Sequence, residues 1–352
     1  MAQHDRPGVA VVGATGYTGA ELLRLLLGHG GVAVTALFAQ TKLAARASQV
    51  LPSLTGLCEL PIERFDPDAV AARASVAFCA LPHGASIEAV TALRARGVKV
   101  FDLSADFRLR DPAVYATWYG APHGATALLN DAVYGLAELN RARLRGAELV
   151  AVPGCYPTAS TLPLLPLLAG GLARPETVIV HALSGVSGAG RTPGASYHFP
   201  ECSEGARNYK VAGTHRHTPE IEQTLSTVLG RPVTVSFTPT LVPMTRGILS
   251  TSYVDAPEGL TAAQLVEAAR DYFKDSPSVS VLDPGALPDT LWVRGSNRAH
   301  VAYAVDPRAQ KIVSMCAIDN LVKGAAGQAV QCMNLALGFD EGRGLHGAAM
   351  FP

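Results

Sequence analysis

Residues 8–27 read GVAVVGATGYTGAELLRLLL, and they form the clearest structural pattern in the chain. A short valine-rich run (8–12) is followed at once by the glycine-rich segment GATGYTG (13–19) and then by a helical pattern of leucines (21–27). A short apolar run bounded by a turn is typical of a buried strand, and apolar residues at helical spacing are typical of a helix. The sequence therefore predicts a strand, a tight turn and a helix, which are half of a βαβ unit.

The same alternation continues along the first 153 residues. Apolar runs at 32–39, 75–81 and 98–104 predict three further strands, and helical patterns precede several of them. Alternating strands and helices are typical of a mostly parallel, doubly wound α/β sheet. We expect a Rossmann-type domain over residues 1–153.

After residues 148–153 longer β-rich runs appear with fewer helices between them, which predicts a second, α+β domain over residues 154–320. Two clear helices are expected there, beginning at Thr218 and Thr261, whose hydroxyls can cap amides of the first turn. A last helix is expected over 321–337. The β-rich runs are TVIVHAL (177–183), PVTVSFTPTL (232–241), GILSTSYVD (247–255), HVAYAVD (300–306) and KIVSMCAID (311–319).

The composition narrows the class of protein. The 352 residues include 29 basic and 29 acidic side chains, so the formal net charge is zero. That balance argues against a nucleic acid or an anionic membrane as partner. Charged residues are 16% of the chain, below the roughly 25% of typical domains, and 48% are apolar. No uninterrupted apolar run reaches the length of a membrane span, and no secretory leader pattern opens the chain. We expect a compact cytoplasmic protein.

The six cysteines stand at positions 58, 79, 155, 202, 316 and 332, without a CxxC pair. They are expected to be reduced thiols. A structural zinc site needs clustered cysteine and histidine ligands, and the HRH stretch at 215–217 has no cysteine close in sequence. We therefore predict no metal.

The glycines of GATGYTG stand at Gly13, Gly16 and Gly19, a GxxGxxG spacing. Glycines between a strand and a helix let backbone amides and the helix N-terminus approach a pyrophosphate. A purely steric role in the turn is the alternative. The strand before and the helix after favour dinucleotide binding, and the other cofactor contacts expected in this segment are Thr15, Tyr17 and Thr18.

The choice between NAD and NADP depends on the residues after the second strand, where NAD enzymes commonly place an acid. No Asp or Glu occurs between Glu21 and Glu59, whereas Thr41, Lys42 and Arg46 follow the strand. Hydroxyl and cationic donors suit a 2′-phosphate, so NADP(H) is favoured, with Lys42 as the expected contact. The alternative is that these are ordinary solvated surface cations.

Cys155 in VPGCYPT stands between a predicted strand and a predicted helix. A helix N-terminus favours thiolate over thiol, so Cys155 is a candidate nucleophile. Inert packing is the alternative. The other cysteines lie mostly in apolar patterns, where a cysteine acts as a small hydrophobic residue.

Histidines and arginines supply further candidates. His215 and His217 in GTHRHTPE directly precede a predicted helix, and a histidine there can exchange a proton near neutral pH. A surface histidine pair at a helix start is the alternative. Three arginines can bind carboxylate or phosphate, although most arginines only face solvent. They are Arg108 in DLSADFRL, Arg191 in SGVSGAGR and Arg246 in PMTRG.

In this order along one chain, GATGYTG, DLSADFRL, VPGCYPT, SGVSGAGR, GTHRHTPEIEQ, PMTRGIL and DNLVKGAAGQA resemble the N-acetyl-γ-glutamyl-phosphate reductases. These are the arginine-biosynthesis members of the semialdehyde dehydrogenase group. The resemblance covers nearly the whole chain. Each motif alone is weak, but the joint occurrence of VPGCYPT and HRHTPE is highly specific.

The resemblance implies an NADPH-dependent oxidoreductase that reduces the acyl phosphate of N-acetyl-L-glutamate to its 5-semialdehyde and releases phosphate. It implies Cys155 as the nucleophile that forms a thioester, His217 as general acid and base, and Glu220 as the neighbour that orients His217. The stretch around Lys42 departs from many relatives, which more often carry serine and arginine there.

The resemblance also implies that residues 321–352 return to the first domain and complete its NADP-binding fold. It implies further contacts and assembly into dimers or tetramers as well. Cofactor contacts are expected at Ser187, Gly188, Asn320 and Gly324, and substrate contacts at Arg108, His215 and Arg246. The residues leave two alternatives open. One is an aspartate-semialdehyde or aminoadipate-type dehydrogenase with the same cofactor, thiol and base. The other is a regulator that senses NADP(H) without catalysis, for which Cys155 and His217 together would be unnecessary.

Overall fold

A computed structural model describes residues 6–352, which divide into two compact units. The first contains the described residues up to Pro153 and the segment Ala325–Gly347. The second contains Gly154–Gly324 and Ala348–Pro352. The chain therefore crosses between the units directly before Cys155 and again next to Gly324, which places two predicted site residues at the crossings.

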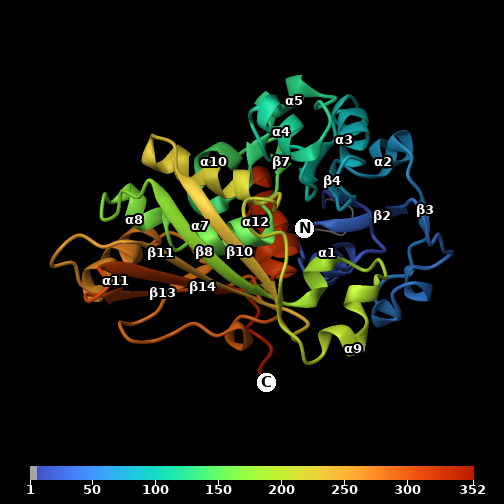
Figure 1. Cartoon of the computed structure of the whole chain (residues 1–352). Helices are drawn as coiled ribbons and strands as arrows, with labels where there is room; N and C mark the ends of the chain where they lie inside the picture. The colour runs from blue at the N-terminus through green and yellow to red at the C-terminus, as the bar shows by residue number, and fades with distance from the viewer. Residues whose placement is uncertain (1–5) are drawn as a thin grey trace. The chain divides into compact units, whose positions relative to one another are not determined.

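Within the described residues, the first unit holds a seven-stranded parallel sheet in the order β3-β2-β1-β4-β5-β7-β6 (Figure 1). The doubly wound α/β prediction is confirmed. The strand order reverses beside β1, and ligands of open α/β sheets bind at such a switch point. The strands are β1 (Gly8–Val12), β2 (Ala33–Ala39), β3 (Ile62–Arg64), β4 (Val76–Cys79), β5 (Lys99–Asp102), β6 (Val133–Tyr134) and β7 (Leu149–Ala151).

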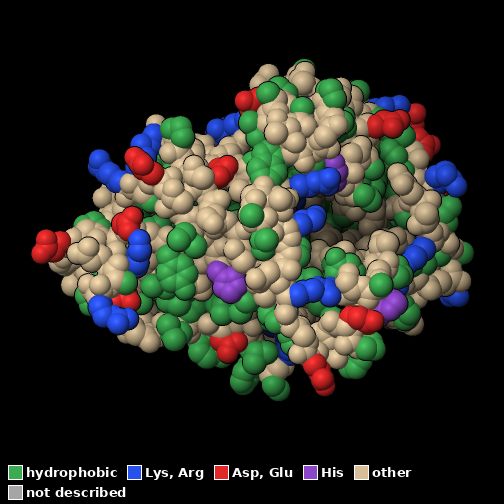
Figure 2. Space-filling model, viewed as in Figure 1, with side chains coloured by type: hydrophobic (Ala, Val, Ile, Leu, Met, Phe, Trp, Pro, Cys, Tyr) green, Lys and Arg blue, Asp and Glu red, His purple; other side chains and the backbone are tan. Residues whose placement is uncertain are grey.

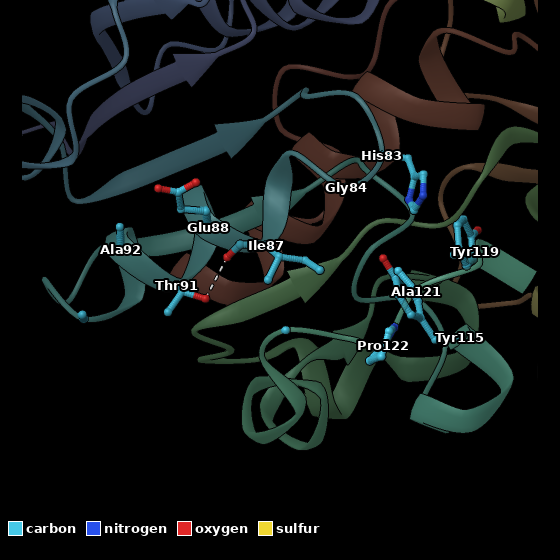
Figure 3. Close-up of a pocket in the computed structure, with 12 residues that line it drawn as sticks. His83, Gly84, Ile87, Glu88, Thr91, Ala92, Tyr115, Tyr119, Ala121 and Pro122 are labelled. Carbon is cyan, nitrogen blue, oxygen red and sulfur yellow. Dashed lines mark hydrogen bonds between the residues drawn. The ribbon is translucent and has the colours of Figure 1, made fainter. Parts of the chain in front are cut away.

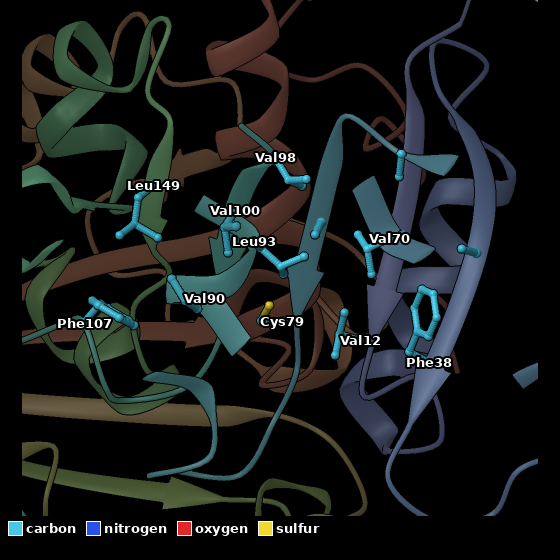
Figure 4. Packing of buried hydrophobic residues seen from close by; sticks show 14 of the residues in the cluster. Val12, Phe38, Val70, Cys79, Val90, Leu93, Val98, Val100, Phe107 and Leu149 are labelled. Carbon is cyan, nitrogen blue, oxygen red and sulfur yellow. The ribbon is translucent and has the colours of Figure 1, made fainter. Parts of the chain in front are cut away.

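Helices cover the sheet of the first unit. Helix α12 packs against α1, α6 and β5, whereas α2 and α3 pack on each other and on β1, β4 and β5. Figure 4 shows the core under α2 and α3, where Phe38 and Val100 of the sheet meet Val70, Val90 and Leu93 of the helices. The helices are α1 (Tyr17–Leu27), α2 (Pro67–Arg73), α3 (Ser86–Arg94), α4 (Pro112–Tyr119), α5 (Thr126–Asp131), α6 (Ala137–Leu144) and α12 (Gly327–Leu337).

The second unit holds a mixed sheet of seven strands among the described residues, in the order β12-β13-β14-β11-β8-β10-β9. Helices α7, α10 and α11 pack on its strands, and α8 packs on α10 and α11. The α+β prediction for this region is confirmed. Its strands are β8 (Thr177–Ser184), β9 (Arg207–Asn208), β10 (Thr234–Leu241), β11 (Ile248–Asp255), β12 (Val279–Val281), β13 (Ala299–Asp306) and β14 (Lys311–Ile318). Its helices are α7 (Cys155–Thr161), α8 (Leu165–Ala169), α9 (Phe199–Cys202), α10 (Thr218–Leu229) and α11 (Ala262–Tyr272).

The predicted threonine cap is right at one helix and wrong at the other. Thr261 accepts a bond from the amide of Gln264, and the Gln264 side chain accepts one from the amide of Thr261, so α11 has a capping box. At α10 the N-cap position belongs to His217, and Thr218 is the first helical residue. Its hydroxyl therefore does not occupy the capping position, and no side chain caps this helix start. The amide of Thr218 is bound by the carbonyl of His215 at 2.9 Å.

The predicted last helix begins as a π-helical turn, η7 (Val322–Ala326), and continues as α12. The amide of Gly324 donates to the carbonyl of Asp319, five residues back, at 3.0 Å. The Asp319 carboxylate also accepts the amides of Leu321 and Val322, which start the turn. Such π-turns are frequent at functional sites. The 3₁₀ turns are η2 (Ala47–Gln49), η3 (Pro52–Leu54), η4 (Val186–Ala189), η5 (Ala195–Tyr197) and η6 (Thr290–Trp292).

Candidate active site

The turn between β1 and α1 needs two of its three glycines for purely steric reasons. Gly13 has a φ of +94°, and a Cβ there would lie 2.3 Å from the carbonyl oxygen of Ala80. A Cβ on Gly19 would lie 2.4 Å from the carbonyl oxygen of Gly13. The amide of Gly13 also donates to the carbonyl of Phe38 at 2.8 Å, which ties the turn to β2. These glycines bring the turn, α1 and the end of β4 into close contact.

Gly16 is different, because no neighbouring atom within residues 6–352 requires a glycine there. It is the N-cap of α1 with an ordinary φ of −79°, and a Cβ would meet only the Gly13 carbonyl, at 3.8 Å. A group bound over the first turn of α1 would need that space, since the first amides of a helix have no carbonyl partner within it. Thr15, Tyr17 and Thr18 flank this position, and Tyr17 is 42% exposed. The turn therefore fits a dinucleotide pyrophosphate.

The segment after β2 carries the predicted 2′-phosphate contact. Lys42 is exposed and has a φ of 58°, three residues after the end of β2 at Ala39. Arg46, also exposed, pairs with Glu59 at 3.8 Å. No acidic residue occurs between the end of β2 and Glu59. Lys42 lies beyond the end of the strand, in a left-handed backbone conformation.

In the second unit, Cys155 is the first residue of α7, with Gly154 as the N-cap. It is half-buried, whereas Cys58, Cys79, Cys316 and Cys332 are buried, which agrees with their expected packing role. Burial raises the pKa of the Cys79 thiol well above its usual value. A Cβ on Gly324 would lie 2.8 Å from the Cβ of Cys155, so the lack of a side chain at Gly324 leaves room for Cys155. Gly324 thus has a structural reason to be glycine beside its predicted cofactor role.

Glu220 connects the start of α10 to the loop of Cys155. Its carboxylate is 1% exposed, and Oε1 accepts the amide of Gly154 at 2.8 Å. The buried carboxylate therefore binds the residue that directly precedes the candidate nucleophile. Glu220 belongs to α10, the helix whose N-cap is His217. The sequence suggested Glu220 as a partner of His217; the bond to Gly154 is a further contact that no local pattern could indicate.

The histidine pair lies among aromatic rings. His215 packs edge-on against Tyr156 and Phe237, with centroid distances of 5.5 and 5.2 Å, and lies 4.9 Å from the ring of His217. Desolvation, helped by the nearby Lys210 ammonium, lowers the pKa of His215 to about 4. His215 is therefore neutral at physiological pH, and its predicted substrate contact would be that of an uncharged imidazole.

Four residues predicted from three separate motifs lie close together, with Asn320 among them. Its Nδ2 donates to Oγ of Ser187 at 2.9 Å, and its Oδ1 accepts the amide of Gly247 at 2.8 Å. A Cβ on Gly188 would lie 3.6 Å from Nδ2 of the same residue. Arg246, next to Gly247, pairs with the buried Asp319 at 3.1 Å. The structure thus brings Ser187, Gly188, Asn320 and Arg246 together.

Sequence reasoning missed Asp319, which organises this cluster. Its carboxylate is fully buried and binds the amides of Gly295, Leu321 and Val322 as well as the Arg246 guanidinium. A carboxylate held by several backbone amides is a strong anchor for a cation. The only local indication was an acid directly after the apolar run that forms β14.

Arg108 lies in the first unit and is 7% exposed. Its Nε donates to the carbonyl of Val152 and its Nη2 to the carbonyl of Leu103, both at 2.8 Å. These carbonyls follow β7 and β5, so the guanidinium joins the ends of two neighbouring strands. Its substrate contact stays a prediction. Arg191 is partly exposed and follows η4, and its binding of an anion also stays a prediction.

Two buried aspartates of DLSADFRL form a network that the sequence did not reveal. Asp106 is fully buried and accepts from the Nδ1 of His83 at 2.8 Å and from the Tyr115 hydroxyl at 3.1 Å. His83 and Tyr115 line a cavity of about 690 Å³ between α3 and α4, which Figure 3 shows with Tyr119 beside them. The predicted site residues do not line this cavity.

Asp102, at the end of β5, gives a pH prediction. Its fully buried carboxylate accepts from the hydroxyls of Ser86 and Ser104, yet desolvation outweighs these bonds and raises its pKa from 3.8 to about 6. The folded protein therefore binds this proton more tightly than the unfolded chain does. The contribution of the Asp102 proton to the free energy of unfolding is fully present below about pH 4. It is lost as the pH rises through about 6.

We expect Asp102→Asn to remove this dependence. The free energy of unfolding of the variant, minus that of the unmodified protein, should increase on the order of 2 kcal/mol from pH 4 to pH 7. Urea unfolding at several pH values measures it. A difference that stays constant across this range would contradict the assignment.

Among residues 6–352, no group of three or more His, Cys, Asp or Glu side chains is arranged to hold a metal ion. Within the same range, no helix is long and apolar enough to cross a membrane.

Two family descriptions match successive parts of the chain. “Semialdehyde dehydrogenase, NAD binding domain” matches residues 8–147, and “Semialdehyde dehydrogenase, dimerisation domain” matches residues 155–320. The boundary between the two matches falls where the chain passes from the first unit to the second.

Curated relatives match nearly the whole chain. A protein of Pelobacter propionicus is 48% identical over 344 residues, and one of Desulforudis audaxviator is 49% identical over 344 residues; each match covers 98% of this chain and 99% of the relative. A protein of Moorella thermoacetica is 48% identical over 342 residues, with 97% and 99% covered. All three are named N-acetyl-gamma-glutamyl-phosphate reductase.

Solved structures of lower identity share the fold. Aspartate semialdehyde dehydrogenase II from Vibrio cholerae superposes with a TM-score of 0.71 at 17% identity, covering 95% of this chain and 99% of that one. Aspartate semialdehyde dehydrogenase with NADP from Candida albicans superposes with a TM-score of 0.68 at 15% identity and the same coverage.

Proposed function

The chain belongs to the semialdehyde dehydrogenase family, and we propose that it reduces N-acetyl-L-glutamyl 5-phosphate to N-acetyl-L-glutamate 5-semialdehyde, with NADPH as reductant and phosphate as leaving group. The resemblance predicted from the motifs is confirmed by relatives that are 47–49% identical over nearly their full length. The structural observation that carries the proposal is the arrangement around Cys155. The cysteine begins α7, and α10 supplies Glu220 to the preceding amide and begins at His217.

Cys155 supplies the nucleophile in this proposal. Its thiolate attacks the acyl carbon, the bond to the phosphate oxygen breaks, and a thioester and free phosphate result. The thioester carbonyl is more electrophilic than that of an oxygen ester. A bound nicotinamide cofactor supplies the hydride that this carbonyl accepts. Cys155 then leaves as thiolate when the thiohemiacetal collapses to the aldehyde.

His217 and Glu220 supply proton transfer and positioning. Collapse of the thiohemiacetal removes a proton from its hydroxyl, and a histidine at the start of α10 suits that exchange. Glu220 holds the Gly154 amide, which keeps the backbone before Cys155 in place. In this proposal the amides of the first turn of α7, which have no carbonyl partner within the helix, would stabilise the substrate oxygen that becomes negative.

One assay separates this function from the alternatives. The reverse reaction is followed as NADP⁺ reduction, with phosphate and either N-acetylglutamate semialdehyde or aspartate semialdehyde. We expect turnover with the N-acetylglutamate compound only, and only when phosphate is present. Turnover with aspartate semialdehyde alone would reassign the substrate. NADP(H) binding without turnover of either aldehyde would favour the regulator.

The cofactor preference gives a second prediction. We propose that Lys42 pairs with the 2′-phosphate, so Lys42→Asp should erase or reverse the preference for NADPH over NADH. A charge-assisted hydrogen bond contributes about 1.5–3 kcal/mol, which corresponds to roughly ten- to a hundredfold in kcat/KM. Aspartate tolerates the left-handed backbone at this position better than most residues, so the fold should persist. Equal use of both cofactors by the unmodified protein would refute the assignment.

We also propose that the chain forms a homodimer or homotetramer in which the second unit binds another copy of the chain. The strands β8 and β11 alternate buried and accessible positions, and the accessible face includes Ile179, 50% exposed, and Tyr253, 38% exposed. These two residues pair across the strands, and Figure 2 shows hydrophobic side chains gathered over this sheet. The matched dimerisation domain covers the same strands. The cytoplasmic location stays a prediction.

A further inference from the structure

His215 holds the start of α10 through two contacts with the backbone. Its Nδ1 accepts the amide of His217 at 3.1 Å, and its carbonyl oxygen accepts the amide of Thr218 at 2.9 Å. The first contact reaches the amide two residues on, which is the pattern of an Asx turn with an imidazole in place of a short amide or carboxylate side chain. His217 itself adopts helical angles at the N-cap position, φ −81° and ψ −12°.

Two other histidines in the described part of the chain make the same contact. The Nδ1 of His29 accepts the amide of Gly31 at 3.2 Å, and the Nδ1 of His123 accepts the amide of Ala125 at 3.1 Å. Both belong to the first unit and neither is a predicted site residue. In both, Nε2 is also bound, to Asn334 and to the carbonyl of Asp106 respectively. The imidazole is thus used repeatedly in this protein as a rigid acceptor for the amide two residues on.

The surroundings of His215 bury its ring and favour its neutral form. It is 8% exposed and has Tyr156, Tyr209 and Phe237 edge-on around it. The titratable groups that face it are Tyr156, Tyr209, His217 and Lys210, and burial lowers the pKa of His215 to about 4. An Nδ1 that accepts a hydrogen bond cannot carry the proton, so the neutral ring carries it on Nε2.

We infer that His215 is a positioning residue, which sets the place of the His217 side chain by holding the His217 amide through Nδ1. This inference rests on the proposed function only in that His217 exchanges a proton with the reacting group. It assigns His215 a role different from the substrate contact that the resemblance implies, because a substrate contact would use Nε2. Loss of the Nδ1 acceptor releases the backbone at His217, and a misplacement of about 1 Å can reduce a rate by 10²-fold.

A pair of amide variants separates the two ring nitrogens. In His215→Asn the side-chain oxygen occupies about the place of Nδ1, and in His215→Gln it occupies about that of Nε2. We expect His215→Gln to lower kcat by roughly 10- to 100-fold with little change in KM. His215→Asn should restore most of that loss. Rescue by glutamine instead of asparagine, an equal loss in both with a raised KM, or normal kcat in both would overturn the inference.

Matched control variants test whether a loss of kcat arises only from impaired folding. His123→Asn and His123→Gln alter the same kind of turn outside the proposed site, and kcat per folded molecule should stay unchanged in both. Urea unfolding of all four variants corrects for the folded fraction. A loss of kcat in the His123 variants equal to that in His215→Gln would show a general effect and overturn the assignment.

A spectroscopic readout keeps the inference separate from the proposed function. The ¹⁵N shifts of His215 in the unmodified protein should show an unprotonated Nδ1 throughout about pH 6–8, the range in which an ordinary histidine titrates. Titration of this ring in that range, or a protonated Nδ1, would overturn the inference even in an active enzyme. Absence of turnover with N-acetylglutamate semialdehyde and phosphate, together with the expected shifts, would overturn the proposed function but leave the backbone contact intact.

Discussion

Replacement of Cys155 by serine abolishes turnover and leaves NADPH binding nearly unchanged; this is the largest effect that we expect. The serine hydroxyl is not ionised near neutral pH and lacks the nucleophilicity of a thiolate, so no acyl intermediate forms. Removal of a catalytic nucleophile reduces kcat by roughly 10⁴–10⁶-fold. The fold should persist, because serine fits the space that Gly324 leaves beside residue 155. Initial rates and fluorescence titration with NADPH measure the two quantities.

Cys202 is the matched control for this experiment. It is the other cysteine that is only half-buried, and it lies in α9, away from the start of α7. Cys202→Ser should keep the rate of the unmodified protein. A substoichiometric thiol reagent should label Cys155 first. Normal reductase activity in Cys155→Ser, or faster labelling of another cysteine, would refute the thioester mechanism.

Replacement of His217 by asparagine should slow turnover by about 10²–10⁴-fold, the usual contribution of general acid–base catalysis. Asparagine keeps the approximate size and a hydrogen-bonding face but exchanges no proton near neutral pH. Its backbone amide can still donate to Nδ1 of His215, so the start of α10 should be preserved. The dependence of kcat on an ionisation near neutral pH should disappear with the side chain, as a pH–rate profile will show.

Thermal unfolding on the same preparations tests the structural alternative for His217. A histidine that only stabilises the start of α10 predicts a lower unfolding temperature with a near-normal rate per folded molecule. That result would remove His217 from the mechanism. It would not transfer the role to His215, because desolvation lowers the pKa of His215 to about 4 and so makes this ring a weak proton acceptor at neutral pH.

His215 and His217 show what local sequence patterns can and cannot predict. HRH before a helical pattern suggested a base, and the motif resemblance selected His217 from the pair. Nothing in the sequence separated the two rings by their environment. Burial among Tyr156, Tyr209 and Phe237 does so, and these residues come from three different parts of the chain. Desolvation depends on what packs around a group, so it is invisible until the fold is known.

Strand prediction failed where strands are short. β3 and β6, with three and two residues, were not expected. Each is a strand because a neighbour in the sheet offers its free edge: β3 pairs with β2, and β6 pairs with β7. A run of two or three residues has too little periodicity to be recognised by itself. By contrast, β1 and α1 were predictable, since each carries its own apolar pattern and the glycines between them permit the turn.

The sequence by itself determined the doubly wound first domain, the β-rich second one, the glycine turn, the cysteine at a strand–helix junction and the family. These depend on periodicity, on backbone freedom at glycine and on residue order, all of which are local. Only the tertiary structure decided the partners: Glu220 binds the amide of Gly154, 66 residues away, and Asn320 binds Ser187, 133 residues away. Buried polar groups must find partners wherever packing brings them, so these pairings follow from the fold and not from spacing along the chain.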